Sequence, residues 1–140
     1  MRILICGLPG TGKTTLAQAL VERLRQKGKT VDWYNADDLR KRLNDWDFSP
    51  EGRIRQAQRM KQFSEQSSTD YVVCDFVAPT DEIRNIFGAD YVIWMDTEKT
   101  SDYEDTNKMF ERPRYVNFIV TTKDAQFLSD MIIKDFERNP

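Results

Sequence analysis

The segment that most constrains the fold of this chain is Gly7-Leu8-Pro9-Gly10-Thr11-Gly12-Lys13-Thr14. It matches the pattern GxxxxGK[ST], whose backbone N–H groups can surround a phosphate chain because the glycines permit close backbone approach. An apolar run at 2–6 precedes it, and an amphipathic stretch at 13–27 follows it. This order of strand, glycine-rich loop and helix predicts a phosphate-binding loop (P-loop) in an α/β domain.

The same alternation of strand-like and helix-like segments continues along the sequence. Apolar runs of strand length lie at 2–6, 30–34, 71–76, 91–95 and 116–120. The stretches between and after them that are typical of helices lie at 13–27, 37–44, 50–66, 80–88 and 122–137. We therefore predict one domain over residues 1–140 with the three-layer P-loop NTPase fold, a parallel five-stranded sheet with helices on both faces.

Composition excludes several classes of function. Histidine is absent, which removes histidine general bases, Ser-His-Asp triads and nearly all zinc sites. The net charge of −2 argues against binding of nucleic acid through bulk charge. No apolar run is long enough for a membrane span, and the first one is too short for a signal peptide. We expect a cytoplasmic protein with a small-molecule substrate, in which Cys6 and Cys74 are reduced, buried side chains.

The P-loop motif predicts ATP and Mg²⁺ as cofactors. Lys13 should reach the β- and γ-phosphates and act in catalysis, and the Thr14 hydroxyl should ligate Mg²⁺. The residues expected to bind the nucleotide are Gly7, Pro9, Gly10, Thr11, Gly12, Lys13, Thr14 and Thr15. The alternative is a glycine-rich turn that binds no nucleotide.

Acidic residues follow two of the predicted strands. Asp75 lies at the end of one apolar run and is expected near Mg²⁺, directly or through water; alternatively, it caps a loop. Asp37 and Asp38 follow another run, and ligands of open α/β sheets bind beyond the carboxyl ends of strands. With no histidine present, Asp37 is the leading candidate for the catalytic base. The alternative is that one of these two aspartates caps a helix.

A basic segment extends from Arg40 to Lys61 in an otherwise acidic chain. Arginine suits bidentate binding of phosphate or sulfate, and Phe48 within the segment could stack on a base. We expect Arg40 and Arg53 to bind an anionic substrate. The other basic residues fit a solvated helix face equally well.

Two later segments remain open to two interpretations each. Arg112 and Arg114 follow an acidic, irregular stretch at 96–105, where a lid arginine could stabilise the transferred charge; they fit an exposed loop equally well. The segment 121–125 could form part of an adenine pocket or cap the last helix.

Several segments together resemble the adenylyl-sulfate (APS) kinase family over about residues 1 to 96. They are the P-loop, Asn35-Ala36-Asp37-Asp38-Leu39-Arg40, Leu43-Asn44, Phe48-Ser49-Pro50-Glu51-Gly52-Arg53 and Phe76-Val77-Ala78-Pro79. That family uses Mg·ATP to phosphorylate the ribose 3′-hydroxyl of adenosine 5′-phosphosulfate (APS), giving PAPS. The resemblance implies that Asp37 is the base or a metal partner. It also implies that Arg40, Asn44 and Arg53 contact APS, that Phe48 stacks on its adenine, and that the chain could form a homodimer.

The sequence departs from the family pattern at several positions. Asn35 and Ala36 replace an aspartate and a glycine, and Gln56 and Gln58 replace an asparagine and an arginine. Ala78 replaces the serine that carries phosphate in some members, which excludes a phosphoenzyme at that position. The usual lid is replaced by residues 105–110 and a short tail, as in compact bacteriophage forms.

Three hypotheses follow from these observations. The first is an APS kinase. The second is a P-loop kinase of another small hydroxyl compound or nucleotide, and the third is a nucleotide-binding protein without catalytic activity. A nucleic acid kinase is a weaker variant, because the basic segment is short and the net charge is negative.

Overall fold

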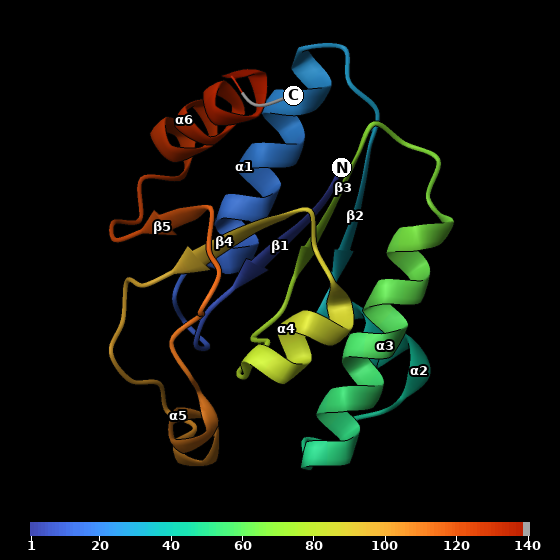
Figure 1. The fold of residues 1–140 in the computed structure, drawn as a ribbon, viewed down its shortest axis with the longest axis vertical. Helices are drawn as coiled ribbons and strands as arrows, with labels where there is room; N and C mark the ends of the chain where they lie inside the picture. Colours follow the sequence, from blue (N-terminus) through green and yellow to red (C-terminus); the bar gives the residue numbers. More distant parts are fainter. Residues whose placement is uncertain (139–140) are drawn as a thin grey trace.

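The computed structural model describes residues 1–138 and contains a five-stranded sheet (Figure 1). Its strands are β1 (Arg2–Cys6), β2 (Val31–Asn35), β3 (Tyr71–Asp75), β4 (Tyr91–Met95) and β5 (Phe118–Val120). They lie in the order β2-β3-β1-β4-β5, and every neighbouring pair is parallel. The predicted parallel five-stranded sheet is therefore confirmed.

Helices cover both faces of the sheet, as expected from strands that are apolar on both sides. Helices α1 (Lys13–Gln26) and α6 (Ala125–Arg138) pack on one face, where Leu16, Leu20 and Ile132 are buried. Helices α2 (Ala36–Leu43), α3 (Pro50–Gln66) and α4 (Asp81–Phe87) pack on the other, where Leu39, Met60 and Phe87 are buried. The short helix α5 (Glu104–Met109) lies beyond the carboxyl ends of the strands, at the bottom of Figure 1.

Side-chain caps begin all three helices on the face of the sheet covered by α2, α3 and α4. Ser49 accepts a hydrogen bond from the Gly52 N–H at 3.2 Å, and Pro50 occupies the first turn of α3. Thr80 caps α4 in the same way. The cap of α2 is Asn35, which accepts from the Asp38 N–H at 3.0 Å. The alternative that Asp37 or Asp38 caps this helix is therefore wrong, and their carboxylates are free of that role.

The C-terminal third differs most from the predicted elements. Helix α6 begins at Ala125 rather than 122, because the Asp124 carboxylate accepts from the Phe127 N–H at 3.3 Å and ends the loop there. Strand β5 begins at Phe118 rather than 116, because the Asn117 side chain and backbone N–H both bond to Val92 on β4. Helix α5 was not predicted, because it is short, acidic at its start and lacks an apolar stripe.

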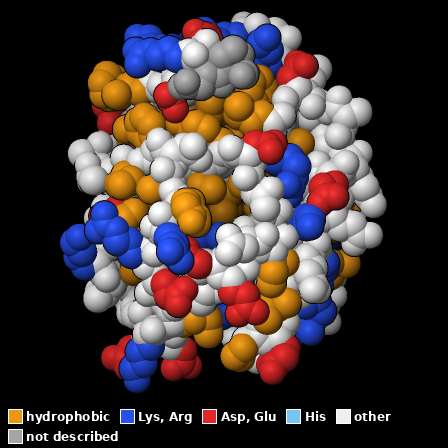
Figure 2. Space-filling model, viewed as in Figure 1, with side chains coloured by type: hydrophobic (Ala, Val, Ile, Leu, Met, Phe, Trp, Pro, Cys, Tyr) orange, Lys and Arg blue, Asp and Glu red, His pale blue; other side chains and the backbone are white. Residues whose placement is uncertain are grey.

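Both cysteines are buried and free, and their burial raises the pKa of Cys6 to about 11 and that of Cys74 to about 12. Thiols with such values are largely protonated near neutral pH and react slowly. Within residues 1–138, no helix has the length and apolar character needed to cross a bilayer. Figure 2 shows apolar side chains across the upper half of one face, beneath an edge with Lys and Arg, and charged side chains of both signs in the lower half, where α5 lies.

Candidate active site

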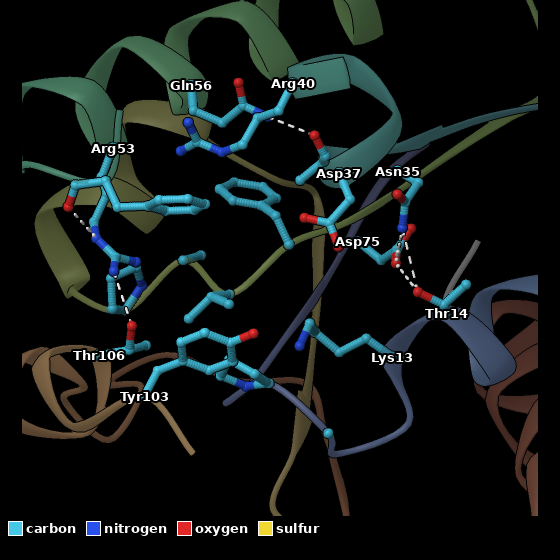
Figure 3. Close-up of a pocket in the computed structure, with 18 of the residues that line it drawn as sticks. Lys13, Thr14, Asn35, Asp37, Arg40, Arg53, Gln56, Asp75, Tyr103 and Thr106 are labelled. Carbon is cyan, nitrogen blue, oxygen red and sulfur yellow. Dashed lines mark hydrogen bonds between the residues drawn. The ribbon is translucent and has the colours of Figure 1, made fainter. Parts of the chain in front are cut away.

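A cavity of about 1060 Å³ lies beyond the carboxyl ends of β1, β2 and β3. Its walls come from the P-loop, the start of α2, the loop before α3, the segment after β3 and residues 102–106 (Figure 3). The predicted site residues that line it are Pro9, Gly10, Gly12, Lys13, Thr14, Thr15, Asp37, Arg40, Phe48, Arg53 and Asp75. Sequence segments far apart are thus brought to one site.

Gly7 and Thr11 do not line the cavity, but their contacts with Met95 and Leu8 determine the conformation of the P-loop. A Cβ on Gly7 would lie 2.8 Å from the Met95 carbonyl oxygen, so only glycine fits where β1 and β4 end side by side. The buried Thr11 hydroxyl donates to the Leu8 carbonyl at 2.8 Å. Both residues hold the loop in its curved conformation.

Two side chains from other loops also donate to P-loop carbonyls. The Thr97 hydroxyl donates to the Thr11 carbonyl at 2.8 Å. The Lys123 ammonium donates to the Gly10 carbonyl at 3.1 Å and pairs with Glu98 at 2.9 Å. The loops after β4 and β5 are therefore attached to the P-loop through the Thr11 and Gly10 carbonyls.

The Lys13 ammonium points into the cavity from the start of α1 (Figure 3). It donates to the Leu8 carbonyl at 3.0 Å. Burial lowers the pKa of Lys13, and the nearby Asp75 carboxylate is the strongest influence that raises it again. A phosphate oxygen could replace the Leu8 carbonyl as the acceptor of this N–H group.

Asp75 at the end of β3 is only 2% exposed and is held by three neutral donors. Its carboxylate accepts from Thr14 at 3.0 Å, from Asn35 at 2.8 Å and from the Trp33 indole at 2.7 Å. Burial raises the pKa of Asp75 above its usual value, and these hydrogen bonds offset only part of that rise. Its partners are side chains, contrary to the alternative that Asp75 caps a loop. Sequence analysis did not single out Trp33, which occupies the position two before Asn35 on the same side of β2.

Thr14 and Asp75 offer adjacent oxygen atoms, the ligand type that Mg²⁺ prefers. Residues 1–138 contain no group of three or more His, Cys, Asp or Glu side chains arranged to hold a metal ion. A magnesium ion at this place would therefore take its other ligands from nucleotide phosphates and water, which is its usual manner of binding. The residues present fit such an ion.

The opposite end of the cavity is aromatic and cationic. The Phe48 ring is 50% exposed, and its centroid lies 4.3 Å from the Arg40 guanidinium carbon and 5.5 Å from that of Arg53. Arg40 also donates to the Asp45 and Asp47 carbonyls at 3.0 and 3.1 Å. Burial lowers the pKa of both arginines, and a guanidinium remains charged even so.

The loop that carries Phe48 is held against α3 by close packing and by ion pairs. A Cβ on Gly52 would overlap the Asp47 carbonyl oxygen, so the loop crosses the helix where only glycine leaves room. Asp45 pairs with Arg55 at 2.9 Å and with Arg59 at 2.6 Å. Asn44 does not line the cavity; it ends α2 in a left-handed conformation (φ 50°, ψ 46°).

Residues 102–106, at the start of α5, form a wall that sequence analysis did not predict. Thr106 accepts from the Arg53 guanidinium at 2.9 Å, and both side chains are buried. Tyr103 is 63% exposed, and its ring extends into the cavity (Figure 3). The other lining residues of this wall are Asp102, Glu104 and Asp105.

Neither arginine of the predicted lid lines the cavity. Arg112 lies over the Trp94 ring and Arg114 over the Tyr115 ring, at 5.1 and 5.9 Å from the ring centroids. The interpretation of both as residues of an exposed loop is therefore favoured.

Asp37 lies between the two ends of the cavity. It is exposed in the first turn of α2, and Figure 3 shows its carboxylate directed into the cavity between Lys13 and Arg40. Gln56, also in the cavity lining, donates to the Ala36 carbonyl at 3.0 Å and so holds the start of α2 against α3. The site thus has a phosphate-binding end, a central carboxylate and a cationic aromatic end.

Comparison with solved structures identifies the fold. The structure of the Mycobacterium tuberculosis APS kinase in complex with AMPPNP and APS matches with a TM-score of 0.81 and 19% identity, over 97% of this chain and 96% of that chain. A shikimate kinase from Aquifex aeolicus matches with a TM-score of 0.68 and 17% identity, over 99% and 98%. At these identities the likeness establishes the P-loop kinase fold alone.

Sequence comparison finds closer likeness over shorter stretches. A cytidine diphosphoramidate kinase of Campylobacter jejuni is 39% identical over 62 residues, which are 44% of this chain and 36% of that protein. A probable adenylyl-sulfate kinase of Aeropyrum pernix is 32% identical over 85 residues, which are 59% of this chain and 46% of that protein. The matched part thus spans less than half the length of either relative. The family model for adenylylsulphate kinase matches residues 1–98, the part that carries the P-loop, Asp37, the cationic end and Asp75, and the chain therefore belongs to the adenylylsulphate kinase family.

Proposed function

We propose that this protein is a P-loop kinase that transfers the γ-phosphoryl group of ATP to the 3′-hydroxyl of APS, giving ADP and PAPS. One observation carries the proposal: a single cavity joins the P-loop to the Arg40–Phe48–Arg53 end, with the Asp37 carboxylate between them. A donor phosphate chain and an acceptor nucleotide can therefore meet where a base is available.

The residues of the phosphate-binding end would hold the donor. P-loop N–H groups and Lys13 bind the β- and γ-phosphates and neutralise charge as it moves toward the leaving ADP. Mg²⁺, held by Thr14 and Asp75 together with the phosphates, would neutralise further charge. The bond between γ-phosphorus and the bridging oxygen breaks, the bond to the acceptor oxygen forms, and Asp37 accepts the hydroxyl proton.

The opposite end suits an acceptor with a planar base and an anionic group. The exposed face of Phe48 offers a stacking surface, and Arg40 and Arg53 supply positive charge beside it. Membership of the adenylylsulphate kinase family supports APS as this acceptor.

The test is ADP release from Mg·ATP with and without APS, with the product identified by mass. We expect a strong APS-dependent rate and a product with the mass of PAPS. An ADP-release rate that APS leaves unchanged would contradict the proposal. Nucleotide binding without transfer to any acceptor would instead support a non-catalytic binding protein.

A second acceptor class is favoured by two observations. The Campylobacter jejuni relative is named for cytidine diphosphoramidate, and it is 39% identical over its 62 matched residues. In addition, Asp102, Glu104 and Asp105 face the cavity, and carboxylates accept hydrogen bonds from a phosphoramidate N–H group that a sulfate lacks. The same assay with cytidine diphosphoramidate decides between the two: the better acceptor is the one with the higher kcat/KM.

A further inference from the structure

Trp33 reaches from β2 to the buried carboxylate at the end of β3. Its indole Nε1 donates to the Asp75 Oδ1 atom at 2.7 Å. In the strand register Trp33 lies opposite Val73, and Asn35 lies opposite Asp75. Trp33 and Asn35 therefore project from the same face of the sheet, and both can reach one carboxylate.

Both carboxylate oxygens of Asp75 accept hydrogen bonds. Trp33 bonds to Oδ1, whereas Asn35 and Thr14 bond to Oδ2 at 2.8 and 3.0 Å. The Asn35 amide also donates to the Thr14 hydroxyl at 3.2 Å. Among the described residues, Trp33 is the donor to Oδ1, so with the two donors to Oδ2 it fixes the plane of the carboxylate from its second oxygen.

We propose that Trp33 is a positioning residue, which orients the Asp75 carboxylate and through it the Thr14 hydroxyl for the divalent cation that accompanies the nucleotide. This inference rests on the proposed function, because it assumes a metal–nucleotide complex at the P-loop. Without the indole N–H, Oδ1 would be a buried acceptor with no partner, and the carboxylate would rotate toward other donors. Loss of a residue that orients a metal ligand weakens metal binding about 10- to 100-fold.

The test compares binding of ADP with and without Mg²⁺ by calorimetry in wild type and in Trp33→Phe. The variant keeps an aromatic ring in the core and lacks the donor. We expect Mg·ADP to bind about tenfold more weakly, and ADP in EDTA to bind as in wild type. The Mg²⁺ concentration for half-maximal transfer should rise by a similar factor. An unchanged Mg²⁺ dependence of ADP affinity would overturn the proposal.

Trp94→Phe is the matched control. Trp94 lies in β4, is 7% exposed, and packs its ring against the Arg112 guanidinium at 5.1 Å rather than against a carboxylate. This control should leave the Mg²⁺ dependence of ADP affinity unchanged, even if it lowers the free energy of unfolding. If Trp33→Phe does not fold, benzothienylalanine at position 33 keeps the shape of indole and removes only the N–H donor. The same tenfold loss is then expected, and wild-type behaviour overturns the proposal.

The two proposals fail in different ways. Wild-type protein that binds Mg·ADP more tightly than ADP but transfers phosphate to no acceptor would contradict the proposed function and leave the Trp33 comparison fully measurable. Wild-type protein that binds ADP equally well with and without Mg²⁺ would overturn the role of Trp33.

Discussion

The two ends of the cavity are built in different ways. At the phosphate-binding end, polar groups have several hydrogen-bond partners: the buried Asp75 carboxylate has three donors, and the Gly10 and Thr11 carbonyls accept from Lys123 and Thr97. At the cationic aromatic end, which we call the acceptor end because we propose that the acceptor binds there, Phe48 and Tyr103 are exposed. Their positions depend on loops that contact α3. Under the proposed function, this contrast fits one nucleotide donor combined with an acceptor that differs among relatives.

If the phosphate-binding end carries the chemistry, Lys13→Ala should have the largest effect. The variant removes the only ammonium that lines the cavity among the described residues, so the transferred phosphoryl group loses a positive charge that would stabilise it in the transition state. We expect kcat to fall about 1000-fold or more in the ADP-release assay. The control is Lys29→Ala, an exposed lysine after α1. Wild-type rates in Lys13→Ala would refute the assignment.

Asp37→Asn separates catalysis from binding. The amide keeps the shape and cannot accept the hydroxyl proton, so we expect kcat to fall about 100-fold with ATP affinity nearly unchanged. The control is Asp38→Asn, whose side chain is exposed and lies outside the cavity lining. Equal losses in kcat and ATP affinity would instead mark Asp37 as a binding or metal residue.

Gly52→Ala should damage the acceptor end alone. The new methyl group would overlap the Asp47 carbonyl, which pushes the Phe48 loop away from α3 and costs about 1–3 kcal/mol in unfolding free energy. We expect the KM for the acceptor to rise about tenfold and the KM for ATP to stay within about twofold. Gln58→Ala, an exposed change on the same helix, is the control. A parallel rise of both KM values would show that the two ends are not independent.

Thr106→Val tests the contact between α5 and α3. Valine keeps the volume but cannot accept the hydrogen bond of Arg53, a loss of about 1 kcal/mol that loosens the wall at residues 102–106. We expect about a fivefold rise in the KM for the acceptor. Thr106→Ser, which retains the hydroxyl, should restore most of the affinity. No difference between valine and serine would mean that the wall is held by other contacts.

The contrast between the two ends also explains what could be predicted from sequence. The P-loop is contiguous and needs no long-range contact, so Lys13 and Thr14 could be placed from the motif alone. Ser49 and Pro50 predicted the start of α3, because capping is local. By contrast, α5 is short and acidic, and the bond from Arg53 that holds Thr106 at the cavity joins residues 53 positions apart in the sequence. Such a pairing leaves no pattern in one sequence.

The same distinction between local and long-range contacts explains why the positions of two individual residues were not predicted. Asn44 was expected at the acceptor, but its left-handed backbone at the end of α2 is a position that asparagine tolerates well. Trp33 was overlooked because a tryptophan in an apolar strand is typical of a core. Only the register that places Asn35 opposite Asp75 brings the indole within reach of that carboxylate.

The smallest expected effect is that of Asp45→Asn, and it depends on pH. Bonds from Arg55, the Asp47 N–H and Arg59 hold the pKa of Asp45 well below its usual value near about 4. The folded protein therefore gains stability from the ionised group above about pH 4 and loses this gain as the pH falls toward the lowered pKa. At pH 7 we expect a slightly lower Tm in Asp45→Asn and about a threefold higher KM for the acceptor. The difference in Tm should shrink below about pH 4. If the difference in Tm between wild type and Asp45→Asn instead increased at acidic pH, Asp45 would not stabilise the loop that carries Phe48 through its charge.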